Sequence, residues 1–380
     1  MQFRVCIKGR ECFFLGSLSK SKPSSLLSSS LLLSAKPSIQ FPETTQKLAM
    51  TSKYAAAHVS TKGPGDARPT ALQIIQDEGL EGKLQGKVAF ITGCSSGIGI
   101  ETARALSATG ATVYAAVRDL EKGKAALGDV LSPGHVELLK LDLSSLSSVR
   151  ECAKEFLAKS STLNILINNA GIMACPESST ADGFEMQFGT NHLGHFLLFN
   201  LLKPTLLASS TPSFNSRVVN VASTGHRYTQ IHFDNLSLAG EYDPSIAYGQ
   251  SKLANIYMAN ELDRRYGSKG LHAFSVHPGG IWSALQRHMP DDQRKVWDTP
   301  QVYVHMKSPA QGAATTVWAA IAREWEGKGG KYLEDCQVSP PVKEGYTVMS
   351  PGYEKYAYDP ESEKKLWTLS LQMVGLEGDE

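Results

Sequence analysis

Apolar and polar positions follow a regular pattern along most of the chain. From Lys87 onward, short continuous apolar runs are separated by longer segments with apolar residues at helical spacing. The runs that indicate strands are 88–91, 111–117, 136–141, 163–167, 217–222 and 271–276. The segments that indicate helices are 98–108, 120–127, 144–159, 191–207 and 246–266. This alternation predicts an α/β fold in which helices cover both faces of a parallel sheet.

The remaining segments extend this pattern at both ends. Residues 309–323 indicate another helix, with Ser308 as its N-cap and Pro309 in its first turn. Residues 331–333 indicate a seventh, edge strand. We therefore expect one doubly wound parallel sheet of about seven strands in a single domain, 87–338. A lead-in, 51–86, precedes it with one short helix, and a C-terminal extension, 339–380, rich in Pro, Tyr and charge, packs on its surface.

Composition narrows the class of protein. The 380 residues carry a net charge of +1, which gives no reason to expect a nucleic-acid partner. The six cysteines show no metal-type spacing, and His192 and His195 lack an evident third ligand, so no metal site is expected. No apolar run is long enough to cross a bilayer. We expect a soluble cytoplasmic protein that acts on a small molecule, and a homo-oligomer is compatible with this composition.

Residues 1–50 differ from the rest of the chain. They contain ten serines and seven Lys or Arg, with Glu11 and Glu43 as the only acids. Three interpretations fit: a mitochondrial transit segment, an extension with too little apolar surface to fold, or an artefact of start-site choice, because Met50 precedes an ordinary enzyme-like N-terminus. We favour the second or third and exclude this segment from the fold.

The first chemically informative motif is Thr92-Gly93-Cys94-Ser95-Ser96-Gly97-Ile98-Gly99, between the first strand and its helix. Glycines permit a sharp turn and let the backbone approach a ligand closely. The helix behind them directs unpaired N–H groups and a partial positive charge at that ligand, which suits a pyrophosphate. The motif alone is a weak signal, and Cys94 within it is interpreted as a small filler.

Polar residues follow the next three strands. Arg118 lies where a dinucleotide fold holds the adenosine ribose, so it is interpreted as a contact for a 2′-phosphate, with an ordinary surface charge as the alternative. Asp119 suits an N-cap. Asp142 either accepts a hydrogen bond from the adenine amino group or, like Ser144, caps the next helix.

Asn168-Asn169-Ala170-Gly171 ends the fourth strand with small residues, which let the chain pass close to a flat cofactor. The Asn side chains are also able to tie neighbouring strands together. That structural role is the interpretation we favour for Asn168.

The strongest signal is Tyr248-Gly249-Gln250-Ser251-Lys252, near the start of a long helix. Tyr248 and Lys252 are four residues apart and therefore share one helical face. An ammonium about 4 Å from a phenolate attracts it by about 4 kcal/mol at an effective dielectric near 20. We therefore expect Lys252 to lower the pKa of Tyr248 below its usual value of about 10, which makes the phenol an acid–base catalyst.

Together these motifs resemble the short-chain dehydrogenase/reductase family. The glycine turn, Asn168–Gly171 and the Tyr248/Lys252 pair match its motifs, in order, over roughly 87–335. The resemblance adds Ser223 as the catalytic serine, Asn191 as the fourth tetrad member, and Pro278–Ser283 as the nicotinamide loop, with Ser283 where threonine is more usual. Residues 113–122 and 223–248 look like the group of retinol dehydrogenases and WW-domain oxidoreductases, which uses NADPH.

The resemblance implies a Rossmann domain with NADP(H) across the carboxyl ends of its strands. Tyr248 would exchange a proton with the substrate oxygen, Ser223 would hydrogen-bond it, Lys252 would hold the ribose, and Asn191 would support a water that links Lys252 to solvent. The residues expected to bind the cofactor are Gly93, Ser95, Ser96, Gly97, Ile98, Gly99, Arg118, Asp142, Leu143, Asn169, Ala170, Gly171, Tyr248, Lys252, Pro278, Gly279, Ile281 and Ser283.

The function expected is NADP(H)-dependent interconversion of a carbonyl and an alcohol. Residues 172–176, 226–231 and 282–290 are candidates for an apolar substrate wall, which favours a fairly large lipophilic substrate. One alternative is a C=C reductase similar to the light-dependent protochlorophyllide reductases. The other is a non-catalytic NADP-binding interaction protein, which the intact Ser223/Tyr248/Lys252 set disfavours.

A first prediction concerns residues 1–49. Because every candidate site lies beyond Lys87 and this segment is too polar to form a core, a chain beginning at Met50 should keep its thermal stability and its activity. The two chains are compared by thermal unfolding and turnover. A loss of several degrees would show that the segment contributes to the fold, and import with trimming by mitochondria would favour the transit interpretation.

Overall fold

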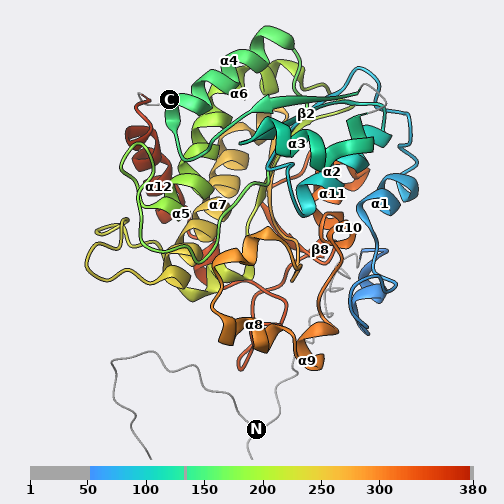
Figure 1. Cartoon of the computed structure of the whole chain (residues 1–380). Helices are drawn as coiled ribbons and strands as arrows, with labels where there is room; N and C mark the ends of the chain where they lie inside the picture. Colours follow the sequence, from blue (N-terminus) through green and yellow to red (C-terminus); the bar gives the residue numbers. More distant parts are fainter. Residues whose placement is uncertain (1–51, 132–134, 377–380) are drawn as a thin grey trace, which may run out of the picture. The chain divides into compact units, whose positions relative to one another are not determined.

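A single sheet organises the residues described by the computed structural model, 52–131 and 135–376 (Figure 1). Its order is β3-β2-β1-β4-β5-β6-β7-β8. The strands are β1 Val88–Thr92, β2 Thr112–Val117, β3 Val136–Lys140, β4 Ile165–Asn168, β5 Ser216–Val221, β6 Leu271–His277, β7 Lys331–Glu334 and β8 Gln337–Val338. All neighbours pair parallel except β7 and β8. This confirms the doubly wound Rossmann fold, with a two-residue antiparallel strand added to the expected seven.

Helices cover both faces of this sheet. One face carries α2 Ile98–Ala108, α3 Leu120–Leu127 and α11 Ala314–Ile321, and α1 Ala71–Asp77 and α10 Pro309–Gly312 pack on α2 and α11. The other face carries α4 Leu146–Lys159, α6 Gly194–Ser209 and α7 Pro244–Tyr266, and α12 Pro360–Met373 packs on α7. Each face has its own apolar core, because the strands are buried on both sides.

Short elements connect these layers. They are α5 Met186–Phe188, α8 Asp291–Trp297, α9 Pro300–Tyr303, the π-helix η3 Gly189–Leu193, and the 3-10 helices η1 Ala55–His58, η2 Gly128–Leu131, η4 Thr224–Tyr228, η5 Gly267–Lys269, η6 Ala284–His288, η7 Arg323–Trp325 and η8 Lys355–Ala357.

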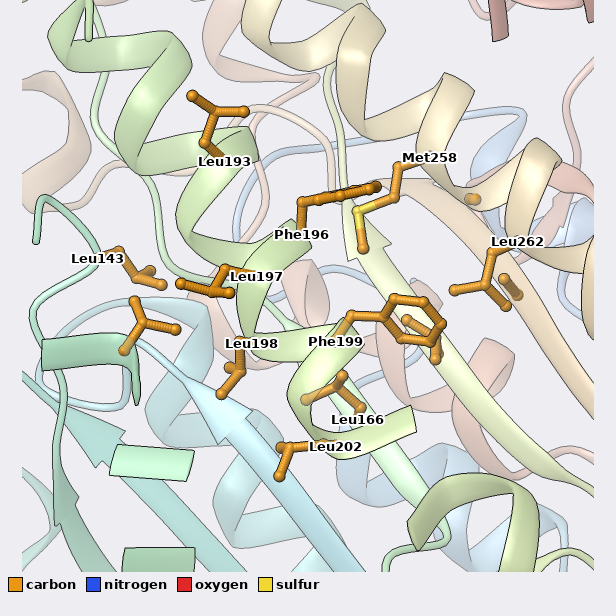
Figure 2. Close-up of a cluster of buried hydrophobic side chains, with 14 of the residues drawn as sticks. Leu143, Leu166, Leu193, Phe196, Leu197, Leu198, Phe199, Leu202, Met258 and Leu262 are labelled. Atoms are coloured by element: carbon orange, nitrogen blue, oxygen red, sulfur yellow. The ribbon is translucent and has the colours of Figure 1, made fainter. Parts of the chain in front are cut away.

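Helix α6 lies at the centre of the apolar core on the face that carries α4, α6 and α7. Leu197, Leu198, Phe199 and Leu202 are fully buried, and Figure 2 shows side chains of α6 packed between the sheet and α7. A helix enclosed in this way is apolar on most of its surface rather than on one stripe. This explains the nearly uninterrupted apolar sequence of the segment.

The sequence predicted most element boundaries to within two residues, with three instructive differences. The helix expected at 309–323 is two helices joined at Ala313. Helix α4 is capped by Ser145, and not by Asp142 or Ser144. The segment expected to be helical from Asn191 begins earlier: α5 runs directly into the π-helix Gly189–Leu193, where Asn191 is held by contacts to Ile172 and Ser251 that no local pattern encodes.

The C-terminal extension contributes side chains to the apolar core. Its polar composition gave no indication of this in the sequence. Asp359 caps α12 and Pro360 occupies its first turn. Leu366 and Trp367 are buried, so the helix is more than a surface covering. Among residues 52–131 and 135–376 no helix is both long and apolar enough to traverse a bilayer. The expectations for residues 1–50 fall outside the described residues.

A second prediction follows from Trp367, which is 2% exposed. Its ring lies 4.9 Å from that of Phe196 and 6.0 Å from that of Phe199, centroid to centroid. Replacing such a buried ring by alanine costs about 3–5 kcal/mol. We expect Trp367→Ala to lower the free energy of unfolding in denaturant by this amount, and the exposed control Lys364→Ala to change it little. Equal stabilities of the two variants would contradict this.

Candidate active site

The carboxyl ends of the parallel strands open into one cavity of about 590 Å³. The sequence-predicted residues that line it are Gly93, Ser95, Ser96, Gly97, Ile98, Arg118, Asp142, Leu143, Asn169, Ala170, Gly171, Ser223, Tyr248, Lys252, Pro278, Gly279, Ile281 and Ser283. Two predicted residues do not line it, Gly99 and Asn191. A Cβ on Gly99 would clash with the carbonyl oxygen of Gly93, so Gly99 permits close packing behind the turn.

The glycine turn presents a helix end to this cavity. Gly97 precedes α2 with φ +62° and ψ −138°, a conformation that residues with a Cβ avoid. No side chain caps α2, so N–H groups of its first turn have no side-chain acceptor. Ser95, Ser96 and Ile98 line the cavity at this end. An uncapped eleven-residue helix that begins at a cavity fits the pyrophosphate of a dinucleotide.

Two exposed cations lie beyond the end of β2. Arg118 and Lys122 both line the cavity, and neither has an ion-pair partner among the described residues. Asp119 accepts a hydrogen bond from the backbone N–H of Lys122 and caps α3, as expected. Sequence reasoning missed Lys122, although its position in the first turn of the helix that follows Arg118 was a usable signal. The pair fits the 2′-phosphate of NADP(H).

Asp142 bonds its neighbour Ser144 and also lines the cavity. Its Oδ1 accepts hydrogen bonds from the backbone N–H and the hydroxyl of Ser144, at 2.9 and 2.6 Å. It therefore holds the loop before α4 without capping that helix. Asp142 and Leu143 both line the cavity, so Asp142 is placed where its carboxylate can still accept a hydrogen bond from an adenine amino group.

The junction of β1 and β4 is fixed by the hydroxyl of Thr92. Its Oγ1 accepts hydrogen bonds from the backbone N–H groups of Asn169 and Ala170, both at 2.9 Å. It therefore has its own proton left for Nε2 of His195, 2.8 Å away. Nδ1 of His195 then donates to the carbonyl of Asn191 at 2.9 Å. Burial lowers the pKa of His195 to about 4, which is consistent with this neutral tautomer.

The two asparagines at the end of β4, Asn168 within the strand and Asn169 after it, have different environments. Asn168 donates to Oδ1 of Asn220 at 2.8 Å and ties β4 to β5, so its role is structural. Asn169 donates to the carbonyl of Thr92 at 2.7 Å, and its buried Oδ1 has no partner among the described residues. Asn169 lines the cavity, so it retains hydrogen-bonding capacity beside it.

Asn191 is positioned by the π-helix and uses its whole side-chain amide. Oδ1 accepts from the N–H of Ile172, and Nδ2 donates to the carbonyl of Ile172 and to Oγ of Ser251, all at 2.9 Å. Ser251 in turn donates to the carbonyl of Tyr248. The structure thus connects Asn191 to the Tyr248 backbone through Ser251. A single-turn π-helix of this kind is frequent at functional sites.

Ser223 and Tyr248 meet at the end of β5. Ser223 Oγ accepts from the N–H of Gly225 at 3.0 Å, and the Tyr248 ring packs on Gly225, where a Cβ would lie 2.9 Å from Cε1. Burial raises the pKa of Tyr248 to about 12, although its interaction with Ser223 opposes that rise. The expected lowering by Lys252 is therefore not what the described structure gives.

Lys252 lies on the same face of α7 as Tyr248, one turn later. Its Nζ donates to the carbonyl of Val221 at 2.9 Å and lies 5.6 Å from the centroid of the Tyr248 ring. Burial lowers the pKa of Lys252 to about 8. Desolvation therefore dominates the pKa of both residues, because the protein packed around them removes water from the phenol and from the ammonium alike.

The loop after β6 completes this side of the cavity. Ser283 accepts from the N–H of Leu285 and caps η6, and a Cβ on Gly97 would lie 3.2 Å from that of Ser283. The loop therefore closes against the glycine turn. The buried Nδ1 of His277, at the start of this loop, has no partner among the described residues.

The three segments predicted to form a substrate wall contribute unequally to the cavity lining. Residues 172–174, Tyr228 and several residues of 283–289 line the cavity, whereas Cys175, Pro176 and Trp282 do not. Cys94 is buried, which raises the pKa of its thiol and agrees with the filler interpretation. His192 contacts Ser370 and is buried as well. Within the described residues no group of three or more potential ligands is arranged for a metal.

Sequence reasoning missed contributions from distant segments. The lead-in supplies His58, Thr61 and Arg68, and the C-terminal extension supplies 348–351. Lys307, Glu334 and Asp335 also line the cavity. No motif marks these residues, because their place in the site depends on how both ends of the chain pack.

The comparisons with known proteins agree with this geometry. A family model described as short chain dehydrogenase matches residues 87–294. The chain is 58% identical over 325 residues to the short-chain dehydrogenase/reductase prx1 of Penicillium roqueforti, covering 85% of this chain and 95% of that protein. It is 41% identical over 300 residues to retinol dehydrogenase 11 of Mus musculus, covering 78% and 89%. Among solved structures, a Pseudomonas aeruginosa RhlG/NADP active-site complex is similar at a TM-score of 0.52 and 25% identity, covering 67% and 96%.

Proposed function

The chain belongs to the short-chain dehydrogenase/reductase family and is an oxidoreductase that resembles retinol dehydrogenases, and we propose that it interconverts a carbonyl and an alcohol with NADP(H). The observation that carries this proposal is the convergence of Ser223, Tyr248 and Lys252 on one cavity at the carboxyl end of the sheet. An acid–base phenol, a second hydroxyl and a buried amine are the groups that such a reaction requires of the protein.

The cofactor would be held by the parts of the chain that fit it. The uncapped start of α2 would bind the pyrophosphate, Arg118 and Lys122 the 2′-phosphate, and Lys252 the ribose hydroxyls. When bound, the nicotinamide would supply or accept the hydride. The NADP complex of the similar RhlG structure supports this choice of cofactor.

The chain's own residues would then handle the proton. In reduction, Tyr248 gives its phenolic proton to the substrate oxygen, and Ser223 donates a hydrogen bond to the same oxygen. In oxidation the proton returns to Tyr248. In this proposal Asn191 acts through position: its amide bonds the backbone of Ile172 and the hydroxyl of Ser251, which holds the start of α7 against the loop after β4. Met173, Leu285, Met289 and Met349 line the cavity and favour a lipophilic substrate.

A third prediction tests the general acid. Tyr248→Phe keeps the ring against Gly225 and removes only the hydroxyl, so NADPH should still bind while turnover falls by about 10²–10⁴. In the wild type, alcohol oxidation should keep rising through the alkaline range, because burial raises the pKa of Tyr248 to about 12 and tyrosinate forms only as the pH approaches that value. The variant should lose that rise.

The matched control is Tyr257→Phe, the same change on α7. Its hydroxyl donates to the carbonyl of Tyr356, and Tyr257 does not line the cavity. We expect it to lose about 1 kcal/mol of stability and little turnover. Retained turnover in Tyr248→Phe would overturn the proposed mechanism, and lost NADPH binding would make Tyr248 structural.

A fourth prediction tests cofactor choice. Because hydrogen bonds to charged groups contribute about 1.5–3 kcal/mol, Arg118→Ala should weaken NADPH binding by about 10- to 150-fold and leave NADH binding nearly unchanged. The control Lys124→Ala removes a nearby exposed cation of α3 that does not line the cavity. Equal affinity of the wild type for NADPH and NADH, or an unchanged preference in Arg118→Ala, would contradict this assignment.

A further inference from the structure

Lys307 lies directly behind the turn that follows β6. Its backbone N–H donates to the carbonyl of Gly280 at 2.8 Å, and Lys307 pairs with Ile281 in an isolated parallel bridge. The side chain is only 3% exposed. Its Nζ donates to the carbonyl of Pro278 at 3.2 Å and to Oδ1 of Asp335 at 2.7 Å.

The turn also rests on the Lys307 stem. Gly279 has φ +102°, and a Cβ there would lie 2.9 Å from both Cδ and Cε of Lys307. The aliphatic part of the side chain therefore fills the space behind Gly279, while the ammonium bonds the preceding carbonyl. Both ends of one side chain thus restrict the same turn.

The carboxylate of Asp335 holds this ammonium in place. Asp335 lies in the connection between β7 and β8 with φ +53°, a left-handed conformation that Asp and Asn tolerate better than most residues. Burial alone would raise the pKa of Asp335, but Lys307 and His58 hold it well below its usual range. The side chain is 35% exposed, so the pair is partly open to the cavity.

The lead-in braces the same assembly. Nδ1 of His58 lies 3.2 Å from Oδ1 of Asp335. Arg68, which is 4% exposed, donates to the carbonyls of His305 and Met306, immediately before Lys307. Gln311 donates to the carbonyls of Asp66 and Arg68. Asp66 and Arg68 are therefore bonded to the segment that carries Lys307, and His58 contacts the carboxylate of Asp335.

We propose that Lys307 is a positioning residue for the nicotinamide end of the cofactor. Its ammonium, oriented by Asp335, fixes the Pro278–Gly279 turn, and the lead-in residues His58 and Arg68 hold Lys307 and Asp335 together. This inference rests on the proposed function in one respect: the turn contacts the bound cofactor. It makes the lead-in part of the cofactor site, whereas residues 51–86 carry no motif for such a role.

The test compares a whole cofactor with its adenosine end. Lys307→Met keeps an aliphatic stem against Gly279 and removes the ammonium. Asp335→Asn keeps a residue suited to the left-handed conformation and removes the carboxylate charge. The probes are NADPH and adenosine 2′,5′-bisphosphate, which has no nicotinamide, and dissociation constants are measured by calorimetry on the folded chain.

We expect each variant to bind NADPH about tenfold more weakly than the wild type, with the affinity for adenosine 2′,5′-bisphosphate unchanged. The double variant should be no worse than Lys307→Met, because the two residues act through one contact. The control Lys328→Met removes an exposed lysine that does not line the cavity and should change neither affinity.

Two results would overturn the inference: unchanged NADPH binding in the variants, or equal weakening of both probes, which would indicate a general structural defect. If Lys307→Met does not fold, the NADPH affinity of Asp335→Asn decides the test, because the Asp335 side chain is 35% exposed and its replacement disturbs the fold less. A wild type that binds neither NADPH nor NADH would instead contradict the proposed function. The two failures are therefore distinguishable.

Discussion

The site depends above all on the hydroxyl of Thr92. In a doubly wound sheet the chain leaves β1 and β4 in opposite directions, so their carboxyl ends separate and form a crevice. The Thr92 hydroxyl accepts hydrogen bonds from the backbone N–H groups of Asn169 and Ala170 and donates one to Nε2 of His195. His195 then bonds the carbonyl of Asn191, whose amide reaches Ser251 beneath Tyr248. Through this chain of hydrogen bonds, one hydroxyl connects the glycine turn, the Asn169 loop and helix α7.

Desolvation sets the electrostatics of this crevice. Tyr248 and Lys252 are both buried, and burial opposes the charged form of each, so the pKa of the phenol rises while that of the amine falls. A simple Coulomb estimate at the separation expected for i and i+4 predicted the opposite result for the tyrosine. It omitted the loss of water, and it placed the ammonium beside the phenol, whereas Nζ bonds the carbonyl of Val221.

Both ends of the described chain close the crevice. The lead-in reaches it through His58 and Arg68, and the C-terminal extension supplies 348–351 as part of the wall. That wall is held by Arg227, which donates to the carbonyls of Val348 and Ser350, each at 2.9 Å. Arg227 belongs to η4, which follows Ser223. The turn that follows the serine therefore also fixes a part of the cavity wall.

The sequence by itself determined the sheet, most of its helices and the motif residues of the site. The reason is local: buried parallel strands must be continuously apolar, amphipathic helices must repeat at 3.6 residues, and the glycine turn and the Tyr248/Lys252 pair have fixed spacings. Asp119 and Ser308 were identifiable as caps because capping acts within three residues. Residues 87–294, which match the family model, contain these local patterns.

Tertiary structure decided what depends on residues far apart in the chain. Lys307, Asp335 and His58 are separated by up to 277 positions, so no spacing relates them. The π-helix at Asn191 and the burial of α12 likewise arise from long-range contacts, with Ile172 and Ser251 in one case and with Phe196 and Phe199 in the other. Tertiary structure also decided that the pKa of Tyr248 is raised and not lowered, because the burial of a side chain depends on the whole fold and cannot be read from one helix.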